Sequence, residues 1–488
     1  KSEKYGAFGG FSMQLERVPT GIKGLDPLIG GGFPKGSLIV LAGNPGTGKT
    51  IFSAQFLYRG VVEYSEKGIY VSFAESRETF YGNMKSYGWD FEDLEKKGDF
   101  KFLDVVTGRE ELLPTILERI VDEVRKMTAK RLVIDSFSAM AQAFEKPIDA
   151  RIIIHTVLSK ITRQEGCTTL MVEEVPFGEE KIGLGMEEFV ADGVLLLERR
   201  IFDGMLLREI TILKLRGTEF ANPTLPFTLK GGFQVFKPLP PGRIEWPTGK
   251  FEVIPHEKDY LSIGVRQLDR IVKGLFTTGS YDLIEVENDV AYPLEYLVAP
   301  IMINFLNQNY GVAIIPPQGI SAKVIKDVLE PYVDDEILQS NLKVSEYVIE
   351  GDCQPEGHHV IPMKGKSIEE DMERFWRAVS QLRERTSKPV LTFVGFDTIE
   401  YMYGVDEALK ILGRDVARVR NFRDIRLNIV RPSIGIADQL RAIAQTYMKV
   451  AQIDGAVFLY GIKPKTPLFH AQLITEDGVH RIELTPIV

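Results

Sequence analysis

The sequence predicts an α/β fold of two tandem domains, each with a parallel-sheet core and flanking helices. In both halves, short apolar runs of strand length alternate with longer amphipathic stretches, which is the pattern of repeated βαβ units. A segment that begins at Thr20 recurs 243 residues later at Ile263. Between the two copies, prolines crowd residues 236–259. These three observations together indicate one fold that is present twice.

Length and composition are those of a globular protein. The chain has 488 residues, which is enough for about three average domains or two large ones. Hydrophobic residues make up 44% and charged residues 26%, so the chain is not a disordered tail. The 59 Lys and Arg against 68 Asp and Glu give a net charge of −9, which repels nucleic acid and anionic lipid outside a local basic patch. This balance excludes a general nucleic-acid coat protein.

Cysteine usage and the lengths of the apolar runs predict a soluble cytoplasmic protein. The two cysteines, Cys167 and Cys353, lie far apart in the sequence and exclude a disulfide framework. No apolar run reaches the roughly 18 residues that a membrane helix needs. Residues 1–11 are charged and glycine-rich and lack the apolar centre of a signal peptide.

The repeat keeps one register without gaps through the first part of each half. All matched positions are 243 residues apart: Gly21 and Gly264, Leu25 and Leu268, Asp26 and Asp269, Gly36 and Gly279, and Gly68 and Gly311. Proline at the density of residues 237–259 breaks helices and strand ladders, so this stretch is predicted to be a semi-rigid linker. We therefore expect a first domain over residues 12–236 and a second over residues 260–488. The strands predicted in the first domain are Leu38–Ala42, Gly68–Phe73, Phe100–Leu103, Arg131–Ile134, Thr169–Val172 and Gly193–Leu197.

A phosphate-binding loop follows the first predicted strand. It fits the pattern GxxxxGK[ST], and a helical stretch, Ile51–Glu63, comes directly after it. The glycines let backbone N–H groups curl around phosphate oxygens, and the helix N-terminus adds the positive end of its dipole. Lys49 would supply a charge to the β- and γ-phosphates, and Thr50 a hydroxyl to Mg²⁺. The predicted nucleotide-binding residues are Gly43, Asn44, Pro45, Gly46, Thr47, Gly48, Lys49 and Thr50.

Three other predicted strands are followed by a carboxylate. Asp135 is expected to hold Mg²⁺ together with Thr50; the alternative is a cap for the next helix. Glu75 would orient and deprotonate the attacking water, with a solvated strand end as its alternative. Glu174 is the candidate sensor of the γ-phosphate, although the neighbouring acid Glu173 competes for that role.

In combination, these motifs resemble the archaeal KaiC-like branch of the RecA superfamily of P-loop ATPases. The segments that carry the resemblance follow the family order over about residues 12–236: Thr20–Asp26, the phosphate loop, Phe73–Ser76, Met84–Asp90, Ile134–Ser136, Glu187–Val194 and Ile212–Thr218. The resemblance implies two tandem RecA-like P-loop NTPase domains, the first of which binds and hydrolyses ATP with Mg²⁺.

The resemblance also implies a homo-oligomer, usually a hexameric ring, that holds ATP between neighbouring subunits. Lys214 and Arg216 would then act in the neighbour's site, since two cations two residues apart on a strand point to one face. Ser86, Leu215 and Thr218 match further nucleotide-contacting positions of the family. Ala74 stands where the family often has the first of two glutamates, so Glu75 would act alone and turnover is expected to be slow.

The second half has lost most of this chemistry. The register places Val286–Pro293 over the phosphate loop, with Tyr292 in place of Lys49 and Pro293 in place of Thr50. Glu287 and Asp289 would repel phosphate, and Gln318 in place of Glu75 cannot act as a base. A strand ending in an acid, Val390–Asp397, is expected to survive, whereas no Lys-x-Arg counterpart follows it. We expect a degenerate RecA-like domain that does not bind ATP in this pocket.

Two features of the second half leave alternatives open. Residues 352–359 contain Cys and His but lack a second matching cluster, so a polar loop is favoured over a metal site. The second feature is a set of seven arginines: Arg414, Arg418, Arg420, Arg423, Arg426, Arg431 and Arg441. Four of them are expected to form either a basic ridge for nucleic acid, an acidic partner or a ring neighbour, or a solvated helix with intersubunit ion pairs. These four are Arg418, Arg420, Arg423 and Arg426.

The predicted function is that of a cytoplasmic ring ATPase acting as a nucleotide-dependent switch or assembly platform, with a protein client. The first alternative is a RecA-like recombination or helicase motor stimulated by nucleic acid, which the arginine cluster motivates but the net charge disfavours. The second is a P-loop regulatory protein that binds a transcription factor. No membrane span is expected in any of these cases.

Overall fold

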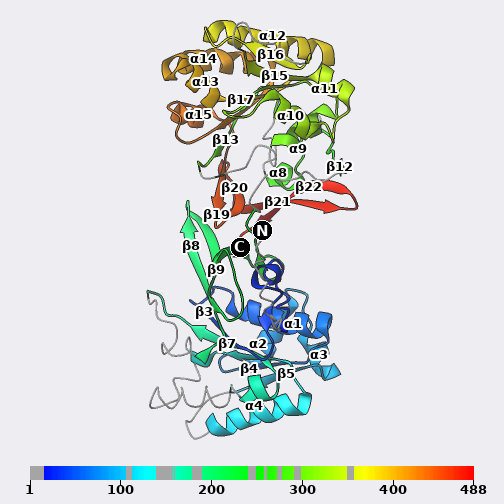
Figure 1. Ribbon diagram of the computed structural model, residues 1–488, viewed down its shortest axis with the longest axis vertical. Helices are drawn as coiled ribbons and strands as arrows, with labels where there is room; N and C mark the ends of the chain where they lie inside the picture. The colour runs from blue at the N-terminus through cyan, green and yellow to red at the C-terminus, as the bar shows by residue number, and fades with distance from the viewer. Residues whose placement is uncertain are drawn as a thin grey trace, which may run out of the picture. The chain divides into compact units, whose positions relative to one another are not determined.

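The computed structural model describes two compact units. The first comprises the chain up to Pro238 with Ile487–Val488, and the second comprises Leu239–Pro486 (Figure 1). The described residues are 16–105, 113–138, 158, 160–178, 190–239, 249–257, 261–271, 277–288, 290, 298–348 and 357–488.

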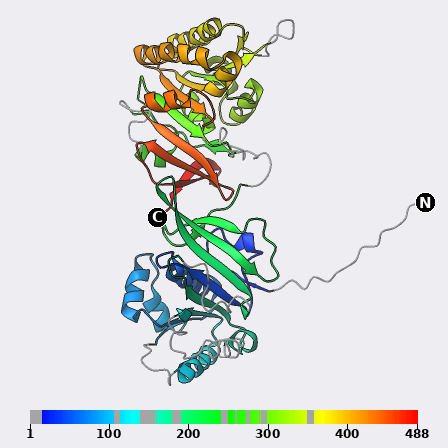
Figure 2. The ribbon, with the colours of Figure 1, turned by 90° about the vertical axis from the view of Figure 1, so that its left-hand side faces the viewer.

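The first unit is an α/β structure around one twisted sheet. Strands β3, β7, β6, β4 and β5 are parallel neighbours in that order, β8 runs parallel to the other side of β3, and β9–β11 continue from β8 in antiparallel fashion. The strands of the first unit are β1 (Arg17–Val18), β2 (Phe33–Pro34), β3 (Leu38–Gly43), β4 (Gly68–Ser72), β5 (Phe100–Asp104), β6 (Arg131–Asp135), β7 (Thr168–Glu174), β8 (Gly193–Phe202), β9 (Met205–Leu215), β10 (Thr224–Thr228) and β11 (Gln234–Val235). All six strands predicted for this half are confirmed, and β8 with β9 forms a long hairpin, green in Figure 2.

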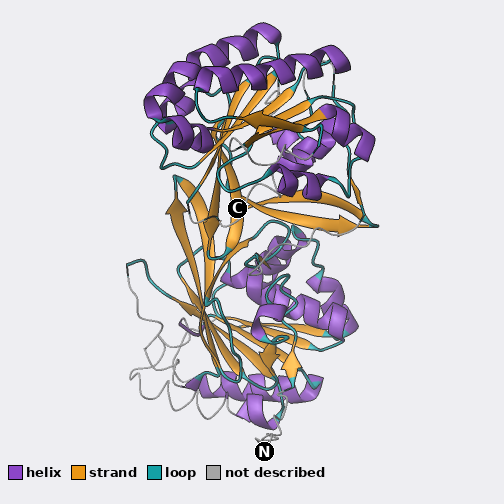
Figure 3. Cartoon of the chain, turned by 45° about the horizontal axis from the view of Figure 1, so that its top comes forward, coloured by secondary structure: helices purple, strands orange, loops and turns teal. Residues whose placement is uncertain are grey.

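Helices cover both faces of this sheet, because parallel strands buried on two sides need cover on both (Figure 3). One apolar layer joins the sheet to α1–α3 and the other joins it to α4. The helical segments are the 3-10 turn η1 (Asp26–Ile29), α1 (Lys49–Tyr64), α2 (Arg77–Lys85), α3 (Phe91–Lys97), α4 (Leu113–Met127) and the π-helical η4 (Lys160–Gln164).

The second unit has a sheet of the same kind. Its order is β12-β22-β21-β20-β19-β13-β18-β17-β14-β15-β16, parallel from β19 to β16 and antiparallel from β19 to β22. Its strands are β12 (Lys250–Phe251), β13 (Tyr281–Val286), β14 (Val312–Ile315), β15 (Leu342–Tyr347), β16 (Val360–Met363), β17 (Leu391–Gly395), β18 (Ile425–Val430), β19 (Tyr447–Ile453), β20 (Ala456–Lys463), β21 (Phe469–Glu476) and β22 (Val479–Pro486).

Two helical layers also cover this second sheet. The apolar clusters place α8–α11 with one face and α12–α15 with the other. Their bounds are α8 (Arg266–Ile271), α9 (Ala299–Leu306), α10 (Ala322–Leu329), α11 (Asp335–Asn341), α12 (Ile368–Thr386), α13 (Phe396–Tyr403), α14 (Val405–Phe422) and α15 (Ala437–Ile443). None of the described helices is long and apolar enough to cross a membrane.

The two sheets share one strand order, which agrees with the repeat in the sequence. The run β10-β9-β8-β3-β7-β6-β4-β5 corresponds strand by strand to β21-β20-β19-β13-β18-β17-β14-β15. Strands β3 and β13 start 243 residues apart, at Leu38 and Tyr281. The repeated aspartates also make the same bond: Asp26 accepts from the N–H of Thr20 at 2.8 Å, and Asp269 accepts from the N–H of Ile263 at 3.0 Å.

The second unit differs from the sequence predictions in two places. The strand expected over Val390–Asp397 ends at Gly395, and Asp397 lies in the first turn of α13, where it accepts the N–H of Gln318 at 3.1 Å. The segment expected as a linker contributes β12, because the aromatic ring of Phe251 is buried in the core of the second unit and β12 pairs with β22. Residues 240–248 and 258–259 of that segment lie outside the described residues.

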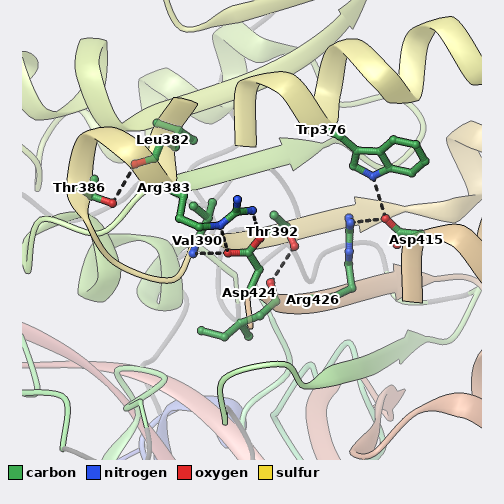
Figure 4. Close-up of polar contacts among 10 residues, drawn as sticks. Trp376, Leu382, Arg383, Thr386, Val390, Thr392, Asp415, Asp424 and Arg426 are labelled. Carbon is green, nitrogen blue, oxygen red and sulfur yellow. Dashed lines mark hydrogen bonds and ion pairs between the residues drawn. The ribbon is translucent and has the colours of Figure 1, made fainter. Parts of the chain in front are cut away.

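The arginine cluster does not form a continuous surface ridge. Arg426 is only 2% exposed, and its guanidinium donates to the carboxylate of Asp415 at 2.5 Å (Figure 4). Arg431 donates to backbone carbonyls and Arg441 to the carboxylates of Glu285 and Asp438. The remaining exposed members lie on or just after α14: Arg414, Arg420 and Arg423, with Arg418 half-buried. Of the loop 352–359, residues 352–356 lie outside the described residues.

The buried carboxylate of Asp415 is expected to contribute strongly to the free energy of unfolding. It also accepts from the indole N–H of Trp376 at 3.1 Å and from the hydroxyl of Tyr281 at 3.2 Å. Asp415→Ala leaves the buried Arg426 without its counter-charge and should lower the free energy of unfolding by about 3–5 kcal/mol. Urea denaturation measures this change. The control Asp438→Ala removes a carboxylate whose side chain is 87% exposed and should change stability by less than about 0.5 kcal/mol; equal effects of the two variants would contradict the prediction.

Candidate nucleotide site

The phosphate loop connects β3 to α1 in a conformation that requires glycine. Gly46 and Gly48 have φ of +77° and +107°, which side chains with a Cβ rarely adopt. A Cβ on Gly48 would also lie 2.9 Å from a methyl carbon of Leu229. Pro45 and Gly46 form the exposed tip of the loop. The glycines therefore set the curvature with which the loop's N–H groups can surround an anion.

Side chains of the loop hold it in this curve. Asn44 donates to the carbonyl of Val175 at 2.8 Å, and the Thr47 hydroxyl donates to the carbonyl of Asn44 at 2.9 Å. The ammonium of Lys49, buried at the first position of α1, donates to the carbonyls of Gly43 and Asn44 at 2.8 and 2.9 Å. Lys49 therefore lies across the loop, where a phosphate would meet its positive charge.

Thr50 and Asp135 meet at the carboxyl edge of the sheet, the edge at which the parallel strands end. The Thr50 hydroxyl donates to Oδ2 of Asp135 at 3.2 Å, and the Tyr70 hydroxyl donates to the same oxygen. Desolvation raises the pKa of Asp135, while both hydroxyls and the charge of Lys49 act against that rise. A hydroxyl and a carboxylate are the oxygen ligands that suit Mg²⁺, which keeps several waters as its other ligands. Among the described residues, no group of three His, Cys, Asp or Glu side chains could hold a metal.

Glu75 lies in a short turn beyond β4. The Ser72 hydroxyl fixes this turn by accepting the N–H of Glu75 at 2.9 Å and donating to its carbonyl at 2.7 Å. The carboxylate of Glu75 accepts from the amide of Asn83 at 2.8 Å. Burial raises the pKa of Glu75, the Asn83 bond lowers it, and the charge of Asp135 raises it further. A carboxylate with a raised pKa at the same edge of the sheet as the phosphate loop is suited to accept a proton from water.

The two acids that end β7 have different surroundings. Glu173 is buried and accepts from the hydroxyl of Ser138 at 2.7 Å. Glu174 is exposed, and in the ladder it pairs with Gly43 at the start of the phosphate loop. Burial lowers the pKa of Lys49, and the charge of Glu174 is the first of two that oppose this change. The electrostatic contact with the loop therefore belongs to Glu174.

The predicted basic pair lies at the opposite edge of the sheet. Gly193, at the start of β8, pairs with Ile39 of β3 on one side and with Leu215 of β9 on the other. Lys214 and Arg216 therefore flank the amino edge, about 13 Å along the strand from the start of the phosphate loop, since a strand rises about 3.3 Å per residue and Ile39 lies four residues before Gly43. There Lys214 donates to the carbonyl of Ala191 at 2.7 Å, and Arg216 pairs with Asp192 at 3.0 Å.

Three other predicted contact residues also lie away from the loop. Ser86 follows α2, and its hydroxyl donates to the carbonyl of Asn83 at 2.7 Å. Leu215 is buried beside Gly193, and Thr218 accepts from Arg17 at 2.7 Å. One unit thus brings together the loop, Thr50, Asp135, Glu75 and Glu174, and links Ser86 to Glu75 through Asn83, but it does not bring Lys214, Leu215, Arg216 or Thr218 to them.

Sequence reasoning missed several residues that contact this site. The guanidinium of Arg208 on β9 donates to the carbonyl of Gly46 at 3.1 Å. Arg199, its cross-strand partner, has a nitrogen 3.4 Å from the position of a Cβ on Gly46. Burial lowers the pKa of Arg208, and the like charge of Arg199 lowers it further. Tyr70 and Asn83 were missed as well, although Tyr70 lies two residues before Ser72 and so shares its face of the strand.

Comparison with known proteins identifies relatives of the first unit. The family described as "ATPase: KaiC" matches residues 18–239. The circadian clock oscillator protein KaiC of Thermostichus vulcanus is 34% identical over 273 residues, which cover 54% of this chain and 51% of that protein. The chain thus spans about half the length of that relative.

Two shorter archaeal proteins match over most or all of their length. The UPF0273 protein MJ1359 of Methanocaldococcus jannaschii is 34% identical over 229 residues, covering 44% of this chain and 93% of that protein. The crystal structure of the KaiC-like protein PH0186 from Pyrococcus horikoshii OT3 has 36% sequence identity and a TM-score of 0.42, covering 46% of this chain and 100% of that chain.

The burial of Asp135 is expected to make the free energy of unfolding depend on pH. Its pKa in the fold lies above the ordinary value of 3.8, so the folded protein binds a proton more readily than the unfolded chain. The contribution of Asp135 to the free energy of unfolding is therefore largest at low pH. It falls as the pH rises from 3.8, the ordinary pKa, through the higher pKa of Asp135 in the folded protein. Asp135→Asn keeps the acceptor oxygen but cannot ionise, so without Mg²⁺ it should be more stable than the wild type at pH 8 but not at pH 4.

Urea unfolding at both pH values, with and without ATP and Mg²⁺, measures this difference. Addition of ATP and Mg²⁺ should stabilise the wild type more than Asp135→Asn, because the variant lacks the anionic ligand. A variant that is less stable than the wild type at pH 8 in the absence of Mg²⁺ would show that desolvation does not dominate at Asp135.

Proposed function

The chain belongs to the KaiC-like ATPases, and we propose that its first unit hydrolyses ATP with Mg²⁺ at sites shared between copies of the chain. The observation that carries this proposal is the convergence of Lys49, the Thr50–Asp135 pair and Glu75 at one edge of one sheet. A cation, a hard oxygen pair and a base beside a phosphate loop are the parts that phosphoryl transfer to water uses.

The phosphate loop and Lys49 bind the polyphosphate in this proposal. The backbone N–H groups around Gly46 and Gly48 donate to phosphate oxygens, and the ammonium of Lys49 exchanges its bonds to the loop carbonyls for bonds to phosphate. Mg²⁺, when bound, would neutralise charge on the phosphates, and Thr50 with Asp135 would hold it.

Glu75 orients and deprotonates the attacking water. The Ser72 turn fixes its backbone, and the Asn83 amide fixes one carboxylate oxygen, which leaves the other oxygen to accept from water. Glu174, beside the loop, senses the γ-phosphate. Because Ala74 precedes Glu75, a single carboxylate carries the proton, and turnover is slow.

The cations that would complete this site come from another copy. Lys214 and Arg216 lie at the far edge of their own sheet, so they reach a phosphate only across a contact between copies. A closed ring, which we propose to be a hexamer, supplies every site with such a neighbour. Leu215 and Thr218 would contact the nucleotide from the same side, whereas Ser86, bonded to Asn83, would contact it from the side of Glu75.

The second unit transmits the nucleotide state of the first to a client protein. Its loop carries Glu287 in the register position of Asn44 and lacks the glycines of the first loop, so it is not expected to bind ATP. Tyr292 and Pro293, which replace Lys49 and Thr50 in the register, lie outside the described residues. The chain would thus act as a nucleotide-dependent switch or assembly platform.

Two substitutions test the catalytic assignment. Lys49→Ala should abolish both ATP binding and turnover, whereas Glu75→Gln should keep ATP binding and lower turnover about 10²-fold or more, because a general base contributes about 10²–10⁴-fold. Steady-state phosphate release and a fluorescent-nucleotide titration measure the two effects. Turnover by Glu75→Gln at the wild-type rate would rule out Glu75 as the base.

A mixing experiment tests whether copies share the site. Lys49→Ala has a defective loop but intact cations, and Arg216→Ala has the reverse, so each variant alone should be nearly inactive. Mixed assemblies contain interfaces with one intact loop and one intact Arg216, and should regain part of the wild-type turnover. If every mixing ratio gives only the sum of the two separate activities, Arg216 does not act across copies.

A further inference from the structure

Five cations gather at the amino edge of the second sheet, the edge at which its parallel strands begin. At the starts of β18, β17, β14 and β15, four residues pair side by side: Ile425, Leu391, Val312 and Leu342. Neighbouring strands lie about 4.8 Å apart, so these four starts span about 14 Å. The cations in or shortly before the starts are Lys343, Arg385, Lys388, Arg420 and Arg423, and we call them the basic edge.

Contacts with neutral groups hold the two arginines at the end of α14. The guanidinium of Arg423 donates to the hydroxyl of Thr278 at 2.9 Å, just before β13. The Cα atom of Arg420 lies 3.8 Å from the position of a Cβ on Gly279. Both arginines therefore lie beside the turn that leads into the central strand β13, and both are exposed.

Neutral groups also hold the two lysines. The ammonium of Lys388 donates to the carbonyl of Gln308 at 2.8 Å and lies 4.6 Å from the centre of the Tyr310 ring. The ammonium of Lys343 donates to the carbonyl of His358. Carbonyls and an aromatic face attract a cation but carry no net charge, so the positive charge of both lysines remains.

Among the residues that the structure describes, no member of the basic edge forms an ion pair with Asp or Glu. Two acids are close to it in the sequence: Glu384 is exposed, whereas Asp424 is buried and bonded to Arg383 (Figure 4). Burial lowers the pKa of Lys343, and the like charge of Arg385 lowers it further. The fold thus holds like charges close together, and an anionic partner would relieve their repulsion.

The first unit balances the corresponding edge within its own fold. Strands β4 and β5 take the places of β14 and β15 in the shared strand order. Cations at the starts of these strands and in the last turn of α4 have carboxylate partners: Lys67–Asp99, Lys101–Glu123 and Arg125–Glu165, at 3.8, 2.6 and 2.8 Å. Ion pairs thus balance this edge in the first unit, whereas in the second its positive charge is available to a partner.

The aromatic rings at the basic edge favour an acidic protein segment over a nucleic acid. Single-stranded nucleic acids bind basic grooves by stacking their bases on open aromatic faces. Here the ammonium of Lys388 lies over the ring of Tyr310, and the guanidiniums of Arg383 and Arg418 lie 4.4 and 5.3 Å from the centre of the Phe422 ring. A carboxylate needs no such face, because a guanidinium binds it through two parallel hydrogen bonds. In an extended segment alternate side chains lie about 7 Å apart, so three carboxylates would span the four strand starts.

We propose that the basic edge binds an acidic segment of a client protein, whose carboxylates pair with Arg385, Arg420 and Arg423. Charge complementarity carries this choice of partner, because the fold gathers the cations at one edge and a client would supply their counter-charges. The inference rests on the proposed role of the second unit toward a client. It adds the chemistry by which that client is recognised.

Fluorescence anisotropy of a labelled peptide of ten glutamates tests this site on the full chain without nucleotide. The wild type should bind the peptide, and Arg385→Glu/Arg420→Glu should bind it at least about tenfold more weakly, since like charges replace opposite ones. Raising the salt concentration should weaken binding by the wild type. The control Lys323→Glu/Lys410→Glu makes the same change in net charge on exposed lysines in the first halves of α10 and α14, and it should change the affinity less than about twofold.

Folding and the choice of partner have their own controls. Circular dichroism checks that each variant is folded, and the neutral variant Arg385→Gln/Arg420→Gln should also bind the peptide more weakly than the wild type. Equal binding by the wild type and the Glu variant, or tighter binding of a ten-nucleotide oligothymidylate than of the peptide, would overturn the inference. A change in assembly mass in sedimentation equilibrium would overturn it too, because the basic edge would then join copies of the chain.

The ATPase assignment and the client site fail in different ways. Lys49→Ala should bind the peptide as the wild type does, because Lys49 lies in the first unit. Unchanged ATP turnover by Lys49→Ala would remove the proposed ATPase and leave peptide binding as a separate result. An active ATPase that does not bind the peptide would overturn only the inference.

Discussion

The parallel pairing of β3 with β7 on one side and β8 on the other is the constraint on which the first unit depends. Because parallel strands in register end together, it collects the phosphate loop, Asp135, Glu75 and Glu174 at one edge. The same pairing directs the β8–β9 hairpin so that Lys214 and Arg216 come to the other edge. One sheet thus separates the anion-binding loop from the cations that would stabilise charge on the transferred phosphoryl group. In the proposed function, a site that needs both would draw them from two copies, and hydrolysis would then respond to assembly.

The second unit keeps this framework and changes the chemistry within it. Its strand order repeats that of the first, and the carbonyl that accepts from Lys49 in one loop has a counterpart that accepts from Arg431 in the other. In both units a cation that donates to this carbonyl holds the loop in its curve. In the first unit the cation is Lys49 of the glycine-rich loop, whereas in the second it is Arg431. In the second unit, the contact between Arg431 and the carbonyl of Glu287 lies within the unit and involves no nucleotide. Buried polar groups such as Asp415 and Arg426 also stabilise the shape of the second unit.

Much of the fold and the loop could be predicted from the sequence because they are encoded locally. Buried parallel strands appear as continuous apolar runs, and the phosphate loop is a contiguous motif. Asp397 was misplaced because the apolar run continues into Phe396, and periodicity does not separate a strand end from the first turn of a buried helix. Arg208 was missed because its contact with Gly46 depends on β8 lying beside β3, a pairing between distant segments.

The central claim is that the two edges of the first unit act together only across copies of the chain. The dependence of specific ATPase activity on protein concentration tests it most directly, with the mass of the assembly measured in the same solutions. Activity per subunit should fall toward zero as dilution dissociates the assemblies. It should reach a plateau at concentrations at which the assemblies are complete. Activity per subunit that stays constant down to concentrations at which the protein is monomeric would contradict it.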